Sequence, residues 1–557
     1  MSDAADSTLA ALVAALPECY QPIYGHPELS VHASRPSADR LAHVAAVHDT
    51  LTRGLGRPLR VLDLGCAQGF FSLSLAARGA HVRGVELLEA NVAVCAHLRA
   101  EHPGLNVRFD LASIVDVLNA LEDDEYDLAL GLSVFHHLVH AQGESAVRDL
   151  IARAIGTTAV VVLEMARRDE PAYWAESQPH DPRALLHAAA FVHELGRHAT
   201  HLSEVRRPLY VASNRVWVLD GHAEPFDSVL DTPHRLAAAS ASTTRRYFLS
   251  DATFLKHFRL SGADAEVNRA DIAREAQLLT SPPAGLSLPA AIASGENEDE
   301  AWLARPLLPG RLLLDLLIDG VPVDGWRVML DVLDEAASLE RSGLYHSDIR
   351  TWNVLVDDAG RGRLIDYASI SEAAHDRVWP HDVFLSFLIF VREVATGVVE
   401  EPQPIRTTSV NPFVLPPPFR NWALALWQRP RGAWSFALMQ ELATNSASVA
   451  GGDGLDAVTI ASSAIENVLA AHDRLARELW RRSEALAQAH TELPLLRQSL
   501  QSLWERVESV AGTLVNAHRA LRRDHDALAG RLAAIESRLP SLPPAETRDP
   551  ETPGLQR

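Results

Sequence analysis

The sequence predicts a multidomain α/β protein that ends in an α-helical coiled coil. Three observations support this prediction. Short apolar runs alternate with helical patterns up to about residue 220, a strand-rich stretch then passes into a helix-rich one, and a heptad pattern follows. The chain has 557 residues, which is enough for two or three domains. We predict a first domain, a linker, a second domain, a coiled coil and a disordered Pro-rich tail, at 1–220, 221–242, 243–455, 456–540 and 541–557.

Composition excludes several classes of protein. The net charge of −21 argues against a surface whose main role is to bind nucleic acid. Three cysteines without CxxC spacing predict neither a zinc site nor a disulfide framework, and they fit a reducing cytoplasm. The acidic N-terminus lacks the basic region of a signal peptide, and no apolar run reaches the roughly 18 residues that a membrane span needs. We expect a cytoplasmic protein that is peripheral to a membrane at most.

The first domain has the pattern of a doubly wound α/β fold. Four apolar runs have the pattern of parallel strands buried on both faces, with helical patterns between them: Arg60–Leu64, His81–Val85, Asp127–Gly131 and Ala159–Leu163. Two further runs, Pro208–Val211 and Arg215–Leu219, are expected to close the sheet.

The second domain begins with strand patterns and becomes helical. Arg246–Leu249 and Phe254–Phe258 have the pattern of strands, and a helix containing Glu275 follows them. A small strand-rich lobe followed by a helical lobe is the order found in protein kinases. The polar stretch that precedes it carries Pro, Asp and Gly and therefore indicates a linker.

The heptad pattern is tested by a strict 4-3 spacing that begins at Val468. Sixteen of twenty such positions are Leu, Val, Ile or Ala, and the exceptions are His472, Arg482, Asp524 and Arg531. This persistence favours a coiled coil over an ordinary surface helix. The alternative is a helical hairpin that folds back on the second domain, which Pro494 favours because proline removes a helical hydrogen bond.

A glycine-bearing turn follows the first predicted strand, in Val61-Leu-Asp-Leu-Gly-Cys-Ala-Gln-Gly69. A strand that ends in Asp63 and is followed by Gly65 and Gly69 suits a tight turn where the backbone approaches a ligand. Glu86 comes 23 residues after Asp63, at the end of the next strand, where a carboxylate can hold two ribose hydroxyls. The segment resembles the S-adenosylmethionine loop of Rossmann-like class I methyltransferases. A turn that only packs is the alternative, and the absence of G-x-G-x-x-G disfavours a dinucleotide.

Two histidines follow the fourth strand, in Gly131-Leu-Ser-Val-Phe-His-His-Leu138. Ligands of such sheets lie at the carboxyl ends of the strands, so His136 and His137 are expected near the reacting methyl, with His137 the catalytic candidate. The alternative for both is a structural histidine at a helix start. Asp110 is a candidate for the adenine edge, and Cys66 is expected to be a packing residue.

The second domain carries a set of residues suited to phosphoryl transfer, a reaction that needs metal ions, positioning and charge. In His346-Ser-Asp-Ile-Arg-Thr-Trp-Asn353 and Leu364-Ile-Asp-Tyr-Ala368, Asp348 is expected to accept the proton of the attacking hydroxyl. Asn353 and Asp366 are expected to hold Mg²⁺. Lys256 is expected to contact the phosphates of ATP, with Glu275 anchoring it.

The set departs from the kinase pattern at two places. No Gly-rich loop follows Tyr247, and Asp366-Tyr-Ala stands where kinases have Asp-Phe-Gly. The alternative is therefore a pseudokinase that serves as a scaffold.

Several longer stretches resemble a known family, the WbdD-type bifunctional methyltransferase/kinases that terminate O-antigen polymannose chains. They run in collinear order over about residues 15–440, and they include Tyr20–Pro27, Asp63–Leu75, Gly131–His137, Arg245–Phe248, Leu308–Leu312, Trp352–Val354 and Leu364–Asp366. These runs are more specific than either short motif.

The resemblance implies two reactions in order. The kinase would phosphorylate a hydroxyl of the non-reducing terminal mannose with ATP and Mg²⁺, and the methyltransferase would then methylate that phosphate with S-adenosylmethionine. A phosphate oxygen is already anionic at pH 7, so positioning by Arg or His can replace a strong base. The residues assigned to cofactor binding are Tyr20, Gln21, Arg40, Asp63, Gly65, Ala67, Gly69, Glu86, Asn91, Asp110, Leu132, Tyr247 and Lys256.

The resemblance also implies partners. They are a lipid-linked O-polysaccharide acceptor, a mannosyltransferase polymerase and, through a coiled coil that acts as a spacer, two further copies of the chain in a trimer. Leu and Val at the heptad seam do not themselves fix the number of strands. Two other hypotheses remain open, namely a kinase–methyltransferase for a soluble small molecule and a methyltransferase with a pseudokinase scaffold.

Overall fold

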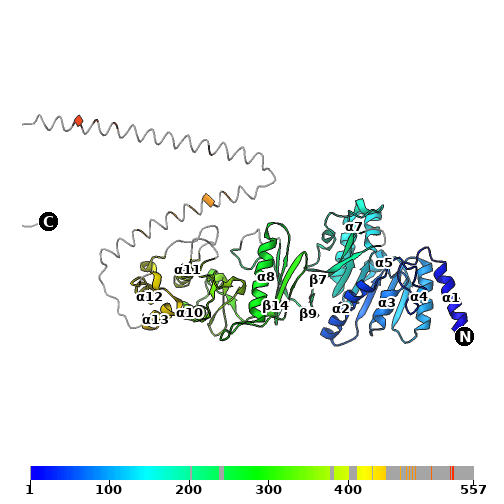
Figure 1. Cartoon of the computed structure of the whole chain (residues 1–557), viewed down its shortest axis with the longest axis horizontal. Coiled ribbons are helices and arrows are strands. Elements are labelled where there is room, and N and C mark those ends of the chain that lie inside the picture. Colours follow the sequence, from blue (N-terminus) through cyan, green and yellow to red (C-terminus); the bar gives the residue numbers. More distant parts are fainter. Residues whose placement is uncertain are drawn as a thin grey trace, which may run out of the picture. The chain divides into compact units, whose positions relative to one another are not determined.

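The computed structural model describes residues 2–200, 204–237, 244–376, 382–399, 410–429 and 431–446, with scattered positions beyond 464. The chain divides into two compact units, Met1–Asp473 and Arg474–Arg557. The predicted coiled coil at 456–540 and tail at 541–557 lie outside the described residues, apart from those scattered positions (Figure 1).

A seven-stranded sheet forms the first domain, in the order β3-β2-β1-β4-β5-β7-β6. The first five strands are parallel, β7 is antiparallel to β5, and β6 is antiparallel to β7. This order confirms the predicted Rossmann-like fold, because the strand order reverses between β1 and β4. The strands are β1 (Arg60–Leu64), β2 (His81–Glu86), β3 (Val107–Leu111), β4 (Leu128–Leu132), β5 (Val160–Glu164), β6 (Phe191–Ala199) and β7 (Arg206–Ser213).

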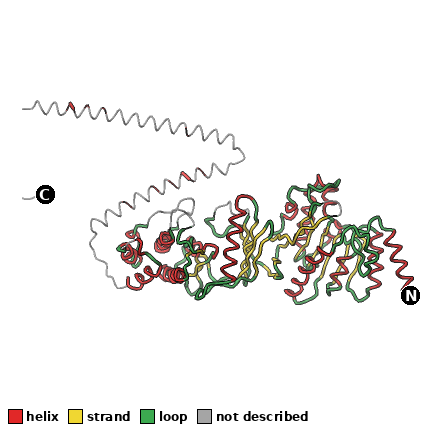
Figure 2. Tube along the Cα trace, in the orientation of Figure 1, coloured by secondary structure: helices red, strands yellow, loops and turns green. Residues whose placement is uncertain are grey.

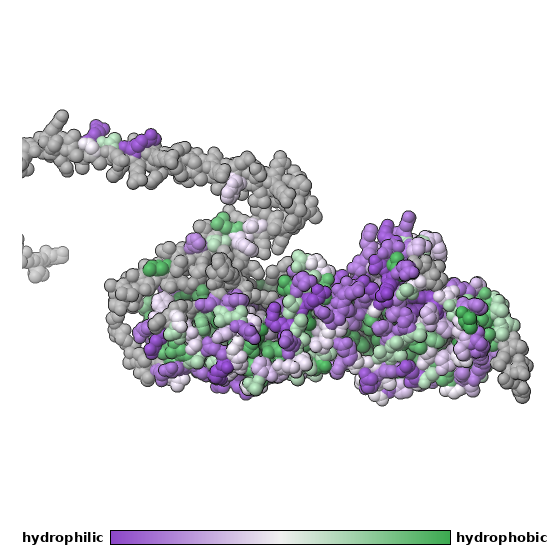
Figure 3. Space-filling model, viewed as in Figure 1, coloured by the Kyte–Doolittle hydropathy of each residue, from purple (hydrophilic) through white to green (hydrophobic). Residues whose placement is uncertain are grey.

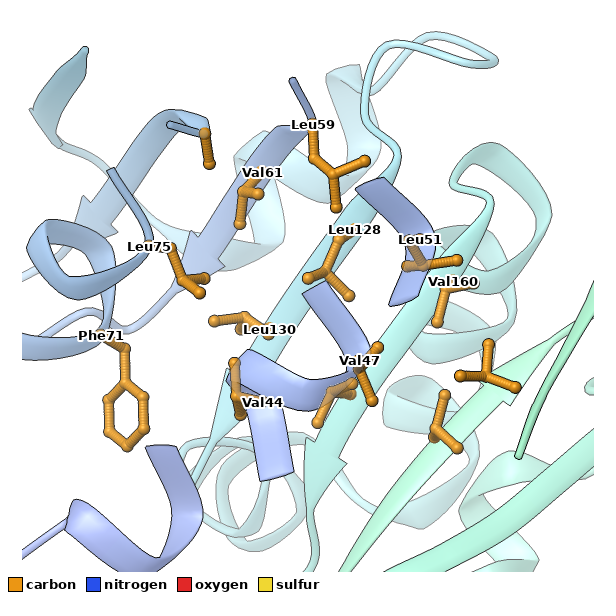
Figure 4. Packing of buried hydrophobic residues seen from close by; sticks show 14 of the residues in the cluster. Val44, Val47, Leu51, Leu59, Val61, Phe71, Leu75, Leu128, Leu130 and Val160 are labelled. Atoms are coloured by element: carbon orange, nitrogen blue, oxygen red, sulfur yellow. The ribbon is translucent and has the colours of Figure 1, made fainter. Parts of the chain in front are cut away.

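Helices cover both faces of this sheet. Val61 and Leu62 are neighbours on β1 and belong to two different core clusters, because successive side chains of a strand point to opposite faces. Figure 4 shows one cluster, in which Val44, Val47 and Leu51 of α2 pack against side chains of β1, β4 and β5. The helices are α1 (Ser2–Ala14), α2 (Ala38–Leu55), α3 (Phe70–Ala76), α4 (Glu89–Glu101), α5 (Ile114–Ala120), α6 (Phe135–Gln142) and α7 (Glu144–Thr157).

Two strand expectations need correction. The run Arg215–Leu219 does not close the main sheet, since β8 (Val216–Leu219) pairs in a separate ribbon with β9 (His222–Pro225). The edge strands β3 and β6 escaped prediction because polar residues interrupt their apolar pattern, as edge positions with one solvated face allow.

The second domain begins with an antiparallel five-stranded sheet, in the order β10-β11-β12-β14-β13, and α8 (Ala265–Thr280) packs against it. Strands β9 and β10 fall within 221–242, so the range expected to be a linker contains strands of its own. The strands are β10 (Ser228–Leu230), β11 (Arg245–Leu249), β12 (Thr253–Arg259), β13 (Ala293–Glu296) and β14 (Glu300–Pro306).

A helical lobe follows, so the predicted kinase-like order of lobes is confirmed (Figure 2). Its longest helix, α10, starts where the Asp324 carboxylate accepts a hydrogen bond from the Arg327 amide at 3.1 Å. The helices are α9 (Leu313–Ile318), α10 (Gly325–Arg341), α11 (Val383–Thr396), α12 (Phe419–Trp427) and α13 (Phe436–Ser446). Short strands connect them, namely β15 (Arg311–Leu312), β16 (Tyr345–His346), β17 (Val354–Val356), β18 (Gly362–Leu364) and β19 (Ile370–Ser371).

The two sheets share a core and a buried ion cluster. Trp217 of β8, Phe248 of β11 and Trp302 of β14 belong to the cluster that also contains the side chains of β1 and β4. The Glu300 carboxylate, which is fully buried, forms ion pairs with Arg183 and with His193 Nδ1, the latter at 2.7 Å. The two domains are therefore held together by apolar packing and by charge.

The surface and the helices were compared with what a membrane span requires. Hydrophilic and hydrophobic residues form a mosaic on the face shown in Figure 3. Among the described residues, every helix is too short or too polar to cross a membrane, including the apolar α11.

Candidate active sites

The glycine turn of the first site joins β1 to α3. Gly65, Ala67 and Gly69 all have positive φ, at 74°, 47° and 80°. A Cβ at Gly65 would lie 2.8 Å from Val134 Cγ2, and one at Gly69 would lie 3.0 Å from the Phe109 ring. Packing and backbone conformation alone thus require both glycines, while the non-glycine Ala67 in this conformation indicates strain of the kind found at ligand sites.

Glu86, the last residue of β2, lies beside this turn. Its Oε2 accepts a hydrogen bond from the Ala67 amide at 2.9 Å, and its Oε1 accepts from the Leu87 and Leu88 amides at 2.9 Å each. The carboxylate is therefore fixed at the carboxyl edge of the sheet, where an ionised carboxylate has lone pairs left for two hydroxyls. Leu87 is 74% exposed and Leu111, at the end of β3, is 54% exposed. Such apolar surface suits an adenine ring, and the sequence analysis missed it.

A series of hydrogen bonds links the N-terminal segment to the glycine turn. The Gln21 amide donates to Gln68 Oε1 at 3.0 Å, Gln21 Oε1 accepts from the Phe70 amide at 3.2 Å, and Gln68 Nε2 donates to Asn91 Oδ1 at 2.6 Å. Gln21 and Asn91 thus both lie against the turn. Gln68 was not predicted, because a glutamine inside a turn carries no motif of its own.

Two acidic residues of the predicted cofactor-binding set, Asp63 and Asp110, are engaged by other side chains of the protein. Asp63 is buried and accepts a hydrogen bond from the Ser72 hydroxyl at 2.7 Å, so it braces the turn against α3. Burial raises the pKa of Asp63 to about 6. Asp110, next to last in β3, accepts from Arg83 Nε at 2.7 Å. It is half-buried, so its other oxygen can still meet a ligand edge.

The end of β4 is surrounded by buried charges. The Arg35 guanidinium donates to both oxygens of Glu164 at 2.8 and 3.0 Å, and also to the Ser133 and Tyr20 hydroxyls at 2.7 and 3.2 Å. Arg40 donates to Glu164 Oε2 at 3.2 Å, so it reaches the site through that carboxylate. Leu132 is buried as the last residue of β4.

The two histidines at the start of α6 differ. His136 is buried against the Trp174 ring, with centroids 4.4 Å apart, and burial, with Arg207, His137 and Arg35 nearby, lowers the pKa of His136 to about 2. It is therefore neutral and suited to packing. His137 is exposed, and its Nδ1 lies 3.2 Å from the Tyr173 hydroxyl, so it is the histidine that a substrate can reach.

The second site is a cavity of about 480 Å³ between the small and the helical lobe. Lys256 Nζ of β12 lies 2.6 Å from Glu275 Oε2 of α8 and 2.9 Å from Asp366 Oδ1. Burial lowers the pKa of Lys256, but the carboxylates of Asp366 and Glu275 outweigh it and hold that pKa above its ordinary value. The lysine is therefore charged and is positioned to meet phosphate oxygens.

The catalytic-loop candidates meet as predicted from their spacing. Asn353 Nδ2 donates to both the backbone oxygen and the Oδ2 of Asp348 at 2.9 Å, and Trp352 Nε1 donates to Asp348 Oδ2 at 3.2 Å. The loop is anchored by a buried ion pair between Arg350 and Glu393 at 2.6 Å. The amide nitrogen of Asn353 is thus engaged within the loop, while the residue lines the cavity.

Asp366 adopts a left-handed conformation with φ of 64°. Its Oδ2 accepts from the Ser369 hydroxyl at 2.8 Å, and both Asp366 and Asn353 line the cavity. A carboxylate and an amide oxygen form the oxygen donor set that Mg²⁺ prefers. The residues present therefore fit this metal.

The missing Gly-rich loop has a structural substitute. The hairpin between β11 and β12 is closed by the Ser250 hydroxyl, which accepts from the Thr253 amide at 2.9 Å. Tyr247 is buried in the cavity wall and is the cross-strand partner of Lys256. Hydroxyl groups thus shape a turn that glycines shape in protein kinases.

His234 enters this site from the range expected to be a linker. Its ring stacks on the Trp352 ring at 5.1 Å and 14°, and the Arg350 guanidinium lies 4.3 Å from the centre of that indole ring. Burial lowers the pKa of His234 to about 4, so the ring is neutral near pH 7. A single histidine in a polar stretch gave no signal of this role.

Comparisons with known proteins found a domain family and several relatives. A family model described as a methyltransferase domain matches residues 61–154. The chain is 42% identical over 438 residues to an Escherichia coli protein named O-antigen chain terminator bifunctional methyltransferase/kinase WbdD. This match covers 77% of the chain and 62% of the relative, so the chain spans somewhat less than two thirds of that relative's length.

Solved structures extend the match. A crystal structure of the bifunctional kinase-methyltransferase WbdD is similar with a TM-score of 0.72 and 39% identity, over 83% of this chain and 100% of that one. A second WbdD structure, with an ordered C-terminal bundle, matches with a TM-score of 0.79 and 38% identity, over 88% of this chain and 99% of that one.

Proposed function

We propose that this chain, which belongs to the WbdD family of bifunctional methyltransferase/kinases, ends the growth of an O-antigen polysaccharide by two successive group transfers. The observation that carries the proposal is the pair of assembled sites on one chain. Lys256, Glu275 and Asp366 are in ion-pair contact at the phosphoryl site, and Glu86 is fixed against the glycine turn at the methyl site.

The first transfer is phosphorylation of a hydroxyl on the terminal sugar, a mannose by the resemblance. Asp348 accepts the hydroxyl proton as the oxygen forms a bond to the γ-phosphorus of ATP and the bond to the β-γ bridging oxygen breaks. Lys256 stabilises the phosphate oxygens. Asn353 and Asp366 would hold Mg²⁺, which would neutralise charge on the transferred group. The geometry of Lys256, Glu275 and Asp366 supports an active kinase over a pseudokinase.

The second transfer is methylation of the new phosphate. An anionic phosphate oxygen forms a bond to the methyl carbon of S-adenosylmethionine as the carbon–sulfur bond breaks and a neutral thioether leaves. No proton moves, so a general base is unnecessary, and His137 serves to orient the acceptor. Glu86 holds the ribose hydroxyls, and the turn formed by Gly65, Ala67 and Gly69 brings its backbone to the same edge of the sheet.

The product explains chain termination. A methyl phosphodiester on the terminal sugar removes the acceptor hydroxyl and leaves no phosphomonoester to extend. We assign the acceptor as a lipid-linked O-polysaccharide, with the enzyme cytoplasmic or peripheral at the inner membrane beside a mannosyltransferase partner. Assembly of several chains through the C-terminal heptads, as a trimer by the resemblance, would set the distance between membrane and active sites.

Mass spectrometry of a synthetic mannose oligosaccharide tests this function. With ATP and Mg²⁺ alone the expected product carries one phosphate, and with S-adenosylmethionine added it carries one phosphate and one methyl. Methylation without ATP would show that the sugar is the methyl acceptor. No modification of the oligosaccharide, together with modification of a soluble metabolite, would favour the small-molecule alternative.

A further inference from the structure

We propose that Arg207 and Ser133 form the binding site for the phosphate group that accepts the methyl. This inference rests on the function proposed above and assigns the acceptor side of the methyl-transfer site. The ligand is a phosphomonoester at the end of a glycan, held at the carboxyl edge of the seven-stranded sheet.

The topology brings both residues to the edge where the methyl donor is expected. Ser133 follows β4 directly, next to the turn that follows β1. Strand β7 runs antiparallel to β5, so its first residues lie at the carboxyl end of β5. Arg207, the second residue of β7, thereby reaches Ser133 Oγ with its Nη1 at 3.3 Å.

Charge at this edge is unbalanced. Three buried guanidinium groups, those of Arg35, Arg40 and Arg207, face two buried carboxylates, those of Glu164 and Glu170. Glu164 is shared by two of the arginines, which leaves one positive charge among these five buried side chains. Asp39, a further carboxylate that interacts with Arg40, is 52% exposed in its side chain and so compensates this buried charge only weakly. An uncompensated buried charge is costly, so the group favours an anionic ligand. The burial and positive neighbours that depress the pKa of His136 reflect the same field.

Arg207 is the arginine whose donors are positioned for a ligand. Its Nε and Nη2 donate to Glu170 at 2.8 to 3.1 Å, and its Cζ lies 5.0 Å from the Trp174 ring centre. Both contacts fix the guanidinium plane. Nη1 is left with the long 3.3 Å contact to Ser133, so it can donate a short bond to a phosphate oxygen without losing its anchor.

Ser133 is held in a strained backbone conformation beside this donor. Its φ is 57°, which is unfavourable for a residue with a Cβ and is found at ligand sites. Its hydroxyl accepts from Arg35 and donates its proton to Glu164. Glu164 keeps both of its arginines when that proton turns to a phosphate oxygen instead. A phosphate held through two oxygens by Arg207 and Ser133 leaves its third anionic oxygen unneutralised and free to attack the methyl carbon.

Kinetics on a chemically phosphorylated mannose oligosaccharide test the inference, since they bypass the kinase. Arg207→Lys and Ser133→Ala are expected to raise the KM for this acceptor about 10- to 100-fold, the loss of one charge-assisted hydrogen bond. Affinity for S-adenosylmethionine and the kinase rate should not change. Arg206→Gln is the matched control, because Arg206 is exposed on the same strand.

Removal of Arg207 alone leaves Glu170 buried without its partner, so the double variant Arg207→Gln with Glu170→Gln provides a second, charge-balanced test. A raised KM in this variant, with unchanged donor affinity, would support the site. An unchanged KM in a folded variant would overturn the inference. If the wild type fails to methylate the phosphorylated acceptor at all, the proposed function fails instead.

Discussion

The two donor sites are built in different ways. At the phosphoryl site the functional side chains bind one another directly, as Lys256 does with Glu275 and Asp366, and they come from recognisable motifs. At the proposed methyl site Glu86 binds the backbone turn after β1, and the edge of the sheet beside it is lined by charges from separate segments. In the second domain the residues of the site are therefore also the residues of the sequence motifs. In the first domain several residues of the site belong to no motif.

The largest expected effect is a substitution that stops phosphorylation and leaves methylation intact. Asp348→Asn should lower the phosphorylation rate about 10²- to 10⁴-fold, because it removes the proton acceptor. Methylation of an already phosphorylated acceptor should be unaffected. Quantifying phosphate incorporation from labelled ATP measures the first rate. Asp358→Asn, on an exposed turn of the same lobe, is the control, and a full rate for Asp348→Asn would refute its role.

The second prediction concerns the contribution of the buried Glu300 cluster, which joins the first and second domains, to the free energy of unfolding. Glu300→Ala should reduce the free energy of unfolding by about 3–5 kcal/mol, because Arg183 and His193 are then left buried without their carboxylate. Urea denaturation measures the change. Glu298→Ala is a suitable control, since Glu298 is 81% exposed in its side chain. Equal stability of the two variants would contradict a structural role for the cluster.

The third prediction sharpens the account of the methyl-donor pocket. Glu86→Gln should weaken S-adenosylmethionine binding about 10- to 100-fold, because charged hydrogen bonds to ribose are replaced by neutral ones. Isothermal titration calorimetry gives the affinity, and ATP binding should stay the same. Glu89→Gln, an exposed residue three positions on, provides the comparison. Unaltered affinity would remove Glu86 from the site.

The smallest effect is a pH dependence that belongs to the methyl site. His136 titrates near pH 6.5 when unfolded and near 2 when folded, so the unfolded state binds the extra proton between these values. Wild-type stability should therefore fall as the pH drops below about 6.5. Relative to His136→Asn, the wild type should lose about 2 kcal/mol between pH 8 and pH 5, as calculated from the two pKa values. Urea denaturation of both proteins at pH 8 and pH 5 measures the change. An equal change in the free energy of unfolding for the wild type and His136→Asn would contradict the prediction.

Sequence alone predicted the parts of the fold that local patterns encode. The buried strands β1, β4 and β5 were found because their apolar runs are continuous, and Asp348, Asn353 and Asp366 because their spacing is a motif. Arg35, Arg207 and His234 gave no such signal, since a single polar residue acquires its role only when the fold brings distant partners to it. The sequence also could not explain how the turn after Tyr247 forms without the glycines of protein kinases, because the hydrogen bond from the Thr253 amide to the Ser250 hydroxyl that closes it is visible only in the structure.

The central claim is that two separate sites on one chain act in a fixed order. The most direct test passes an oligosaccharide from Glu86→Gln, supplied with ATP and Mg²⁺, to Asp348→Asn, supplied with S-adenosylmethionine, and follows its mass. The claim predicts a phosphorylated intermediate and then a methyl phosphodiester, whereas the reverse order of the two variants should give a phosphorylated oligosaccharide that carries no methyl. Methylation of the unphosphorylated oligosaccharide by Asp348→Asn would contradict it.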